Sequence, residues 1–130
     1  MDKRNTKQKA ALRDAFLKAD RPLSPEEVLQ NARKYHPAIG IATVYRNIQM
    51  LLEDGWLVGV ELPGTSTHYE LAGKGHHHHF HCNACGKVFE LKGCNIAVKP
   101  RLPHGFKATG HEFFLYGDCS SCSAGSRART

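Results

Sequence analysis

Hydrophobic residues in the first half of the chain recur at the spacing of amphipathic helices. Residues 7–19 place alanine, leucine and phenylalanine side chains on one helical face. Further along, Val44, Ile48, Leu51 and Leu52 follow the i, i+4, i+7, i+8 pattern of one buried stripe. The pattern therefore predicts two helices, each of which buries one face and leaves the other exposed to solvent.

A further helix between these two begins with a clear start signal. Ser24 suits an N-cap, Pro25 suits the first helical position, and Glu27 stands where it completes a capping box. After the last helix, residues 56–62 and 67–71 are strand-like and flank the turn Pro-Gly-Thr-Ser, which predicts a hairpin. Three helices followed by a hairpin is the order of a winged helix-turn-helix, whose third helix enters a DNA major groove.

The second half of the chain contains shorter apolar runs. Strand-like segments are expected at residues 77–81, 87–91 and 112–117, and the connection before the last of them has space for only a short helix that ends before Pro100. A segment of this length rarely folds without a metal, a disulfide or a partner subunit.

These patterns predict an α+β chain with four parts. The winged helix occupies residues 1–72, a hinge residues 73–75, a second domain residues 76–122 and a disordered tail residues 123–130. No apolar run approaches the ~20 residues needed to cross a bilayer. We therefore expect a cytoplasmic protein with no membrane partner.

Charge adds a candidate partner. The formal net charge is +6, and Lys and Arg outnumber Asp in residues 1–20. A basic arm suits a polyanion such as DNA, and an ordinary solvated surface is the alternative.

Four of the five cysteines form two Cys-x-x-Cys pairs. Cys82 and Cys85 make the first pair, Cys119 and Cys122 the second, and Cys94 is left over. Four thiolates at about 2.3 Å in a tetrahedron make a closed structural zinc site. The alternatives are two local disulfides or a redox Cys-x-x-Cys.

A run of histidines directly precedes the first cysteine pair. If the run forms a strand, His77 and His79 point to one side and His76 and His78 to the other, so that one strand supplies two metal sites. A solvated polyhistidine loop is the alternative. The other candidate ligands suggested by the sequence are Glu70, Glu90 and His111.

No motif indicates an enzyme. The chain has no His-Glu-x-x-His and no Gly-x-Ser-x-Gly sequence. We expect no catalytic residues.

Three segments in order carry a resemblance to a known family. The chain has "IATVYRNIQML", then "HHHHFHCNACGKVFEL", then "HEFFLYGDCSSC". Over roughly residues 4–122 it resembles the ferric uptake regulator (Fur) family of bacterial metal-responsive transcriptional regulators. The resemblance implies a homodimer that binds double-stranded, AT-rich operator DNA when metal-loaded and represses transcription. The expected fold is thus α+β, a winged helix-turn-helix DNA-binding domain followed by a small α/β dimerisation domain with a four-cysteine zinc site.

The resemblance also assigns metal ligands position by position. The structural Zn²⁺ ligands are Cys82, Cys85, Cys119 and Cys122. The regulatory hinge ligands are Glu70, His77, His79 and Glu90, with His68 as a further candidate. The additional site takes His76, His78 and His111. The hinge set suits Fe²⁺ or Zn²⁺, with Mn²⁺ as a further candidate.

DNA contacts are expected from the third helix and the N-terminal arm. The resemblance implies base contacts by Tyr45 and Arg46 and a minor-groove contact by Arg4. Thr43 and Gln49 join them because they also lie off the buried stripe of the third helix.

Two positions depart from the family pattern. Pro22 stands where members often have a histidine ligand, so the hinge site is expected either to use His68 or His36 or to hold its ion with four ligands. Ala97 stands where the additional site often has an acid.

The expected function is metal-dependent repression that controls metal homeostasis in response to iron or zinc. The peroxide-sensing branch of the family typically has aspartate in place of Glu90. The alternatives are a peroxide- or redox-sensing regulator of the same family and a metal-storage or chaperone module.

Overall fold

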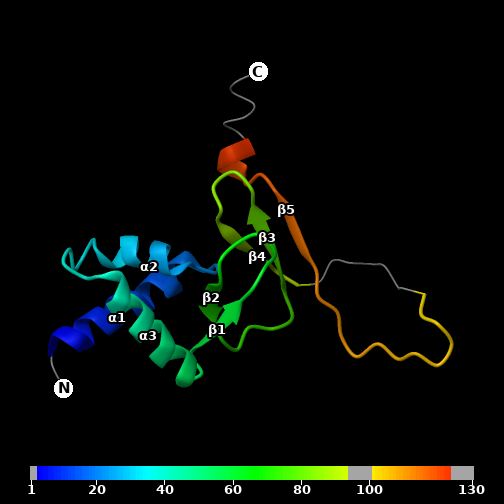
Figure 1. Cartoon of the computed structure of the whole chain (residues 1–130), viewed down its shortest axis with the longest axis horizontal. Helices are drawn as coiled ribbons and strands as arrows, with labels where there is room; N and C mark the ends of the chain where they lie inside the picture. Colours follow the sequence, from blue (N-terminus) through cyan, green and yellow to red (C-terminus); the bar gives the residue numbers. More distant parts are fainter. Residues whose placement is uncertain (1–2, 94–100, 124–130) are drawn as a thin grey trace.

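The computed structural model describes residues 3–93 and 101–123, with side chains from residue 6 onward (Figure 1). Three helices come first: α1 (Lys3–Ala19), α2 (Pro25–Ala32) and α3 (Ile41–Glu53). The strands that follow are β1 (Leu57–Val60), β2 (His68–Leu71), β3 (His78–Cys82), β4 (Val88–Leu91) and β5 (Phe114–Gly117). The element order confirms the α+β class expected from the sequence.

The three helices pack around one apolar core. Leu12 and Phe16 of α1 meet Val44, Ile48 and Leu51 of α3 there, all of them buried. The stripe predicted for α3 is confirmed, except that Leu52 at its margin is only partly buried.

The predicted capping box at the start of α2 is also confirmed. The Oγ of Ser24 accepts from the backbone N–H of Glu27 at 3.2 Å, and the Glu27 carboxylate accepts from the backbone N–H of Ser24 at 3.1 Å.

The strands form two separate sheets. In the first, β1 pairs antiparallel with β2 directly after α3, which completes the helix–helix–helix–hairpin order of a winged helix. The second sheet has the order β4-β3-β5, in which β3 is antiparallel to β4 and parallel to β5. The predicted strand-like runs are confirmed, with each strand starting one or two residues later than expected.

The parallel pairing of β3 and β5 requires a long connection, because a parallel neighbour cannot be reached by a tight turn. Its described part, residues 101–113, is mostly exposed and extends away from the sheet (Figure 1). Cys94, Ala97 and the short helix expected before Pro100 lie outside the described residues, as does the expected tail from residue 124 on.

Candidate metal centres

The two cysteine pairs meet at one end of the second sheet. Cys82 is the last residue of β3, and Cys119 follows β5 by two positions. Because β3 and β5 are parallel, both pairs leave the sheet at the same end, and the Asn83 N–H donates to the Gly117 carbonyl at 2.8 Å. The predicted structural-zinc residues are thus brought together, with four sulfurs within 4.8 Å of one another: Cys82, Cys85, Cys119 and Cys122.

The sulfur spacing fits a tetrahedral ion. The Sγ atoms of Cys85 and Cys119 are 3.8 Å apart. A tetrahedron with metal–sulfur bonds of about 2.3 Å has edges of about 3.8 Å. All four described cysteines are free thiols, so the structure gives no support to the two local disulfides.

Backbone donors prepare this group for negative charge. The N–H groups of Cys85 and Cys119 donate to the Cys82 sulfur at 3.5 and 3.3 Å, and they lower the pKa of Cys82 to about 6. The pKa of Cys122 is raised to about 12, first by its hydrogen bond with Cys119. Without a cation, four adjacent sulfurs therefore do not all ionise near neutral pH, whereas a divalent cation lets them do so.

A second group consists of three histidines. The rings of His76, His78 and His111 present nitrogens within 4.8 Å of one another. The Nε2 of His78 is buried and has no hydrogen-bond partner among the described residues. Burial, followed by the neighbouring His76 and His111, lowers the pKa of His78 and so favours the neutral imidazole that metals bind. This group is the predicted additional site.

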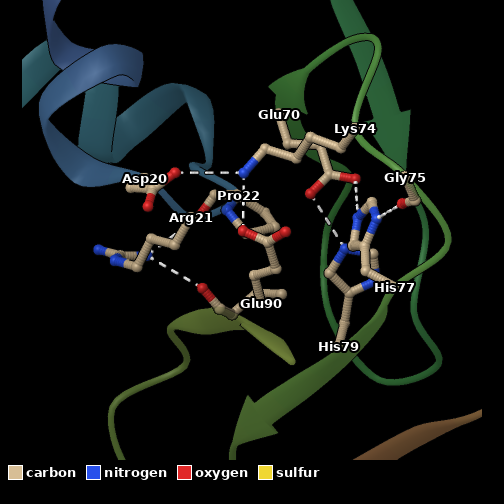
Figure 2. A network of polar contacts seen from close by, with 10 residues as sticks. Asp20, Arg21, Pro22, Glu70, Lys74, Gly75, His77, His79 and Glu90 are labelled. Carbon is tan, nitrogen blue, oxygen red and sulfur yellow. Dashed lines mark hydrogen bonds and ion pairs between the residues drawn. The ribbon is translucent and has the colours of Figure 1, made fainter. Parts of the chain in front are cut away.

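The third group joins the hairpin to the second sheet. The buried Glu70 of β2 lies 2.8 Å through Oε1 from the Nε2 of His77, and 3.1 Å through Oε2 from the Nε2 of His79 (Figure 2). His77 and His79 thus face a different group from His76 and His78, as strand alternation predicted. A cavity of about 480 Å³ lies beside this group and is lined by residues from the hairpin and by Phe113 and Phe114.

Hydrogen bonding orients the ligand nitrogen of His77. Its Nδ1 lies 2.7 Å from the Gly75 carbonyl and its Nε2 faces the Glu70 carboxylate, so both ring nitrogens face acceptors. Burial lowers the pKa of His77, but the Gly75 carbonyl and Glu70 outweigh it and the net pKa is raised. Burial likewise raises the pKa of Glu70, and His79 and His77 reverse this to a net lowering. A cation can take the place of the proton between Nε2 and carboxylate while Gly75 holds the ring.

Two predicted hinge ligands are not brought into this group. The Glu90 carboxylate instead accepts from the ammonium of Lys74 at 2.7 Å (Figure 2). His68 is buried with its Nδ1 2.8 Å from the Ser66 carbonyl and its Nε2 3.8 Å from Glu27. Glu90 and His68 are thus held by nearer partners, and their place among the hinge ligands stays a prediction.

The other predicted candidate for completing the hinge site, His36, is also not brought into it. His36 lies in the turn after α2, away from the Glu70 group. The carbonyl of Pro22 accepts from the Arg21 guanidinium at 3.0 Å.

Sequence reasoning missed Lys74, although it is the only cation in the predicted hinge. Its hydrogen bond to Glu90, and then that to Asp20, raise the pKa of Lys74 against the opposing effect of burial. The signal in the sequence is a single lysine between two glycines. The position of one lysine in the sequence does not indicate which carboxylates its side chain contacts.

The expected DNA-contacting side chains lie on the outer face of α3. Tyr45 is 48% exposed, Arg46 and Gln49 are exposed, and Thr43 is partly buried. Arg46 donates to the Thr43 hydroxyl at 3.1 Å. The expected minor-groove residue Arg4 lies in the first turn of α1, and its side chain is outside the described part.

Among the described helices, none combines the length and the apolar character needed to cross a membrane.

A family model described as the ferric uptake regulator family matches residues 1–116. The chain belongs to the ferric uptake regulator family. The match ends before Cys119. The assignment of Cys119 and Cys122 to the four-cysteine group therefore depends on the distances between the sulfur atoms.

Curated relatives cover most of the chain. The ferric uptake regulation protein of Campylobacter jejuni is 36% identical over 123 residues, covering 91% of this chain and 78% of that protein. The protein of the same name from Escherichia coli K12 is 32% identical over 133 residues, covering 88% and 90%. The family is one of transcriptional regulators, which are not enzymes.

Solved structures share the fold. The Helicobacter pylori ferric uptake regulator has a TM-score of 0.64 at 24% identity, covering 90% of this chain and 80% of that one. A zinc-bound manganese uptake regulator has a TM-score of 0.71 at 22% identity, covering 86% and 87%. The Campylobacter jejuni peroxide stress regulator has a TM-score of 0.58 at 21% identity, covering 92% and 91%. Regulators of metal uptake and of peroxide stress therefore share this fold.

Proposed function

We propose that the chain is a metal-dependent, DNA-binding repressor that controls metal homeostasis from the cytoplasm. Fe²⁺ or Zn²⁺ is the sensed ion, with Mn²⁺ as a further candidate. The observation that carries the proposal is the position of Glu70, His77 and His79. This donor group joins the β1–β2 hairpin, which is the wing of the winged helix, to the second sheet.

The three donor groups have separate roles. The four cysteines hold a structural Zn²⁺, which stabilises the small second domain over residues 76–122. Glu70, His77 and His79 form the regulatory site at the hinge, residues 73–75. The group of His76, His78 and His111 is an additional site within the second domain.

Regulation follows from where the hinge donors lie. Glu70 belongs to β2, whereas His77 precedes β3 and His79 lies within it, so the three meet where the hairpin lies against the second sheet. A divalent cation supplies the positive charge that favours this arrangement. It does so only to the extent that it binds this arrangement more tightly than arrangements in which the three donors are apart. In a homodimer, the closed arrangement fixes the spacing of two α3 helices against an AT-rich operator.

The decisive experiment replaces both hinge histidines. A His77→Ala/His79→Ala variant and a matched His104→Ala control, which removes an exposed histidine, are titrated on AT-rich duplex DNA with and without Fe²⁺, Zn²⁺ or Mn²⁺. We expect the double variant to lose metal-dependent binding while it remains a folded, zinc-containing dimer. The hinge assignment is wrong if that variant still requires metal to bind DNA.

A further inference from the structure

One ammonium group joins three segments of the chain beside the hinge donors. The Nζ of Lys74 lies 2.7 Å from an oxygen of Glu90 and 3.2 Å from an oxygen of Asp20 (Figure 2). Asp20 follows α1, Lys74 lies between β2 and β3, and Glu90 belongs to β4. The Lys74 and Glu90 side chains are only 18% and 11% exposed, so their contact is largely shielded from water.

The backbone and a second cation support the same contact. Asp20 has φ of 50°, a left-handed conformation that few residues other than glycine adopt and that aspartate tolerates better than most. The adjacent Arg21 donates to the Val88 carbonyl of β4 at 3.3 Å, and its guanidinium lies 5.5 Å from the centre of the Phe89 ring. The side chains of Lys74 and Arg21 therefore fix the segment after α1 to β4.

Glu90 lies next to the hinge donors despite this contact. In the β3–β4 ladder, Glu90 is directly opposite His79, and directly opposed residues of an antiparallel pair share one face of the sheet. The Nε2 of His79 already reaches Glu70. A carboxylate that neighbours the donor group on one face is thus held by Lys74.

We propose that Lys74 is a built-in cation that competes with the regulatory ion for Glu90, and that it thereby sets how tightly the hinge site binds metal. The inference rests on the proposed regulatory role of Glu70, His77 and His79. With Lys74 in place, the site offers three donors, and Glu90 joins them only when its ion pair with Lys74 breaks. A lysine in the hinge therefore weakens metal binding and raises the ion concentration at which the protein responds.

The test measures metal affinity directly rather than repression. Co²⁺ is the probe, because its absorption reports binding, and it is titrated into zinc-loaded protein that carries His111→Ala to disable the three-histidine group. The variants are Lys74→Met, Lys74→Arg, Glu90→Gln and the Lys74→Met/Glu90→Gln double variant. Lys92→Met is the matched control, because Lys92 is an exposed lysine directly after β4.

We expect Lys74→Met to bind Co²⁺ about tenfold more tightly, the order of effect seen when a group around metal ligands is changed. Lys74→Arg and Lys92→Met should stay near the parent affinity, and the gain should vanish in the Glu90→Gln background. Unchanged or weaker binding by Lys74→Met, or a gain that persists without Glu90, overturns the competition. Circular dichroism checks folding, and Lys74→Gln replaces Lys74→Met if the latter does not fold.

The same titration distinguishes a failure of the proposed regulatory site from a failure of the proposed role of Lys74. If Co²⁺ binds the parent and His77→Ala/His79→Ala removes that binding, the hinge assignment holds and Lys74 is judged by its own variants. If the hinge double variant binds Co²⁺ as well as the parent does, the regulatory site itself is wrong, and the role of Lys74 is wrong with it.

Discussion

The Nε2 atoms of His76 and His111 lie 3.2 Å apart, although the two residues are 35 positions apart in the chain. A ring nitrogen of His78 lies within 4.8 Å of one from each of these two rings, and the buried Nε2 of His78 lacks a hydrogen-bond partner in the described part of the chain. Three nitrogens therefore converge at a place that suits a borderline metal ion.

Replacing His111 should remove one bound ion. We expect equilibrium dialysis against Zn²⁺ to show His111→Ala binding one ion fewer per protomer than the parent, because two rings alone leave the group incomplete. His104→Ala, in the same exposed connection, should keep the parent stoichiometry. An unchanged count in His111→Ala would exclude the three-histidine group as a metal site.

Replacing Cys82 should unfold or monomerise the second domain. The Cys82 sulfur is buried and accepts from two backbone N–H groups, so a serine there loses both a metal ligand and a site suited to negative charge. Thermal unfolding and size-exclusion chromatography with light scattering measure the outcome. Cys94→Ser is the control and should behave as the parent. A stable, dimeric Cys82→Ser protein would contradict the structural-zinc proposal.

Glu27 should make stability depend on pH. Burial raises its pKa, but Arg21 and the Ser24 backbone outweigh this and leave the net pKa lowered. A lowered folded-state pKa means that the stabilisation is complete above the unfolded-state pKa of about 4.3 and is lost as pH falls through the folded value.

We therefore expect Glu27→Gln to reduce the free energy of unfolding by about 1 kcal/mol at pH 7, with the difference from the parent shrinking as the pH falls below about 4.3. Urea unfolding followed by circular dichroism between pH 7 and pH 3.5 measures this. Glu26→Gln, on the exposed side of the same first turn, should give no comparable difference. A pH-independent gap for Glu27→Gln would show that its charge does not stabilise the fold.

Arg46 should contribute to DNA affinity through charge. We expect Arg46→Ala to weaken binding to the operator and, if Arg46 contacts a phosphate, to reduce the slope of log affinity against log salt by about one. Fluorescence anisotropy at several salt concentrations measures both quantities. Arg101→Ala, an exposed cation in the long connection, is the control. Equal effects of the two substitutions would mean that α3 has no special role.

Local patterns in the sequence predicted the parts of the fold that local chemistry determines. The Ser24 capping box depends on residues three apart, and the separation of His79 from His78 depends only on alternation within β3. The two cysteine pairs were equally readable, because metal ligation restricts the spacing within each pair.

The partners of single charged side chains were not predictable in the same way. Lys74 reaches Asp20 across 54 positions and Glu90 across 16, and no periodicity relates these residues. The resemblance to the family placed Glu90 among the hinge ligands, whereas the folded chain brings its carboxylate to the ammonium group of Lys74. Which of two cations holds a carboxylate depends on distances that only the folded chain defines.

The parallel pairing of β3 with β5 has a consequence for the order of events during translation. Cys85 and Cys119 are separated by 34 positions, so the second pair leaves the ribosome later than the first. At about 5–20 residues per second, the delay is roughly 2–7 s. Throughout that interval the winged helix is already synthesised, while Cys82 and Cys85 lack the other two cysteines of their group. The nascent chain thus passes through a stage at which its winged helix is fully synthesised but its second domain still lacks residues that it needs to fold.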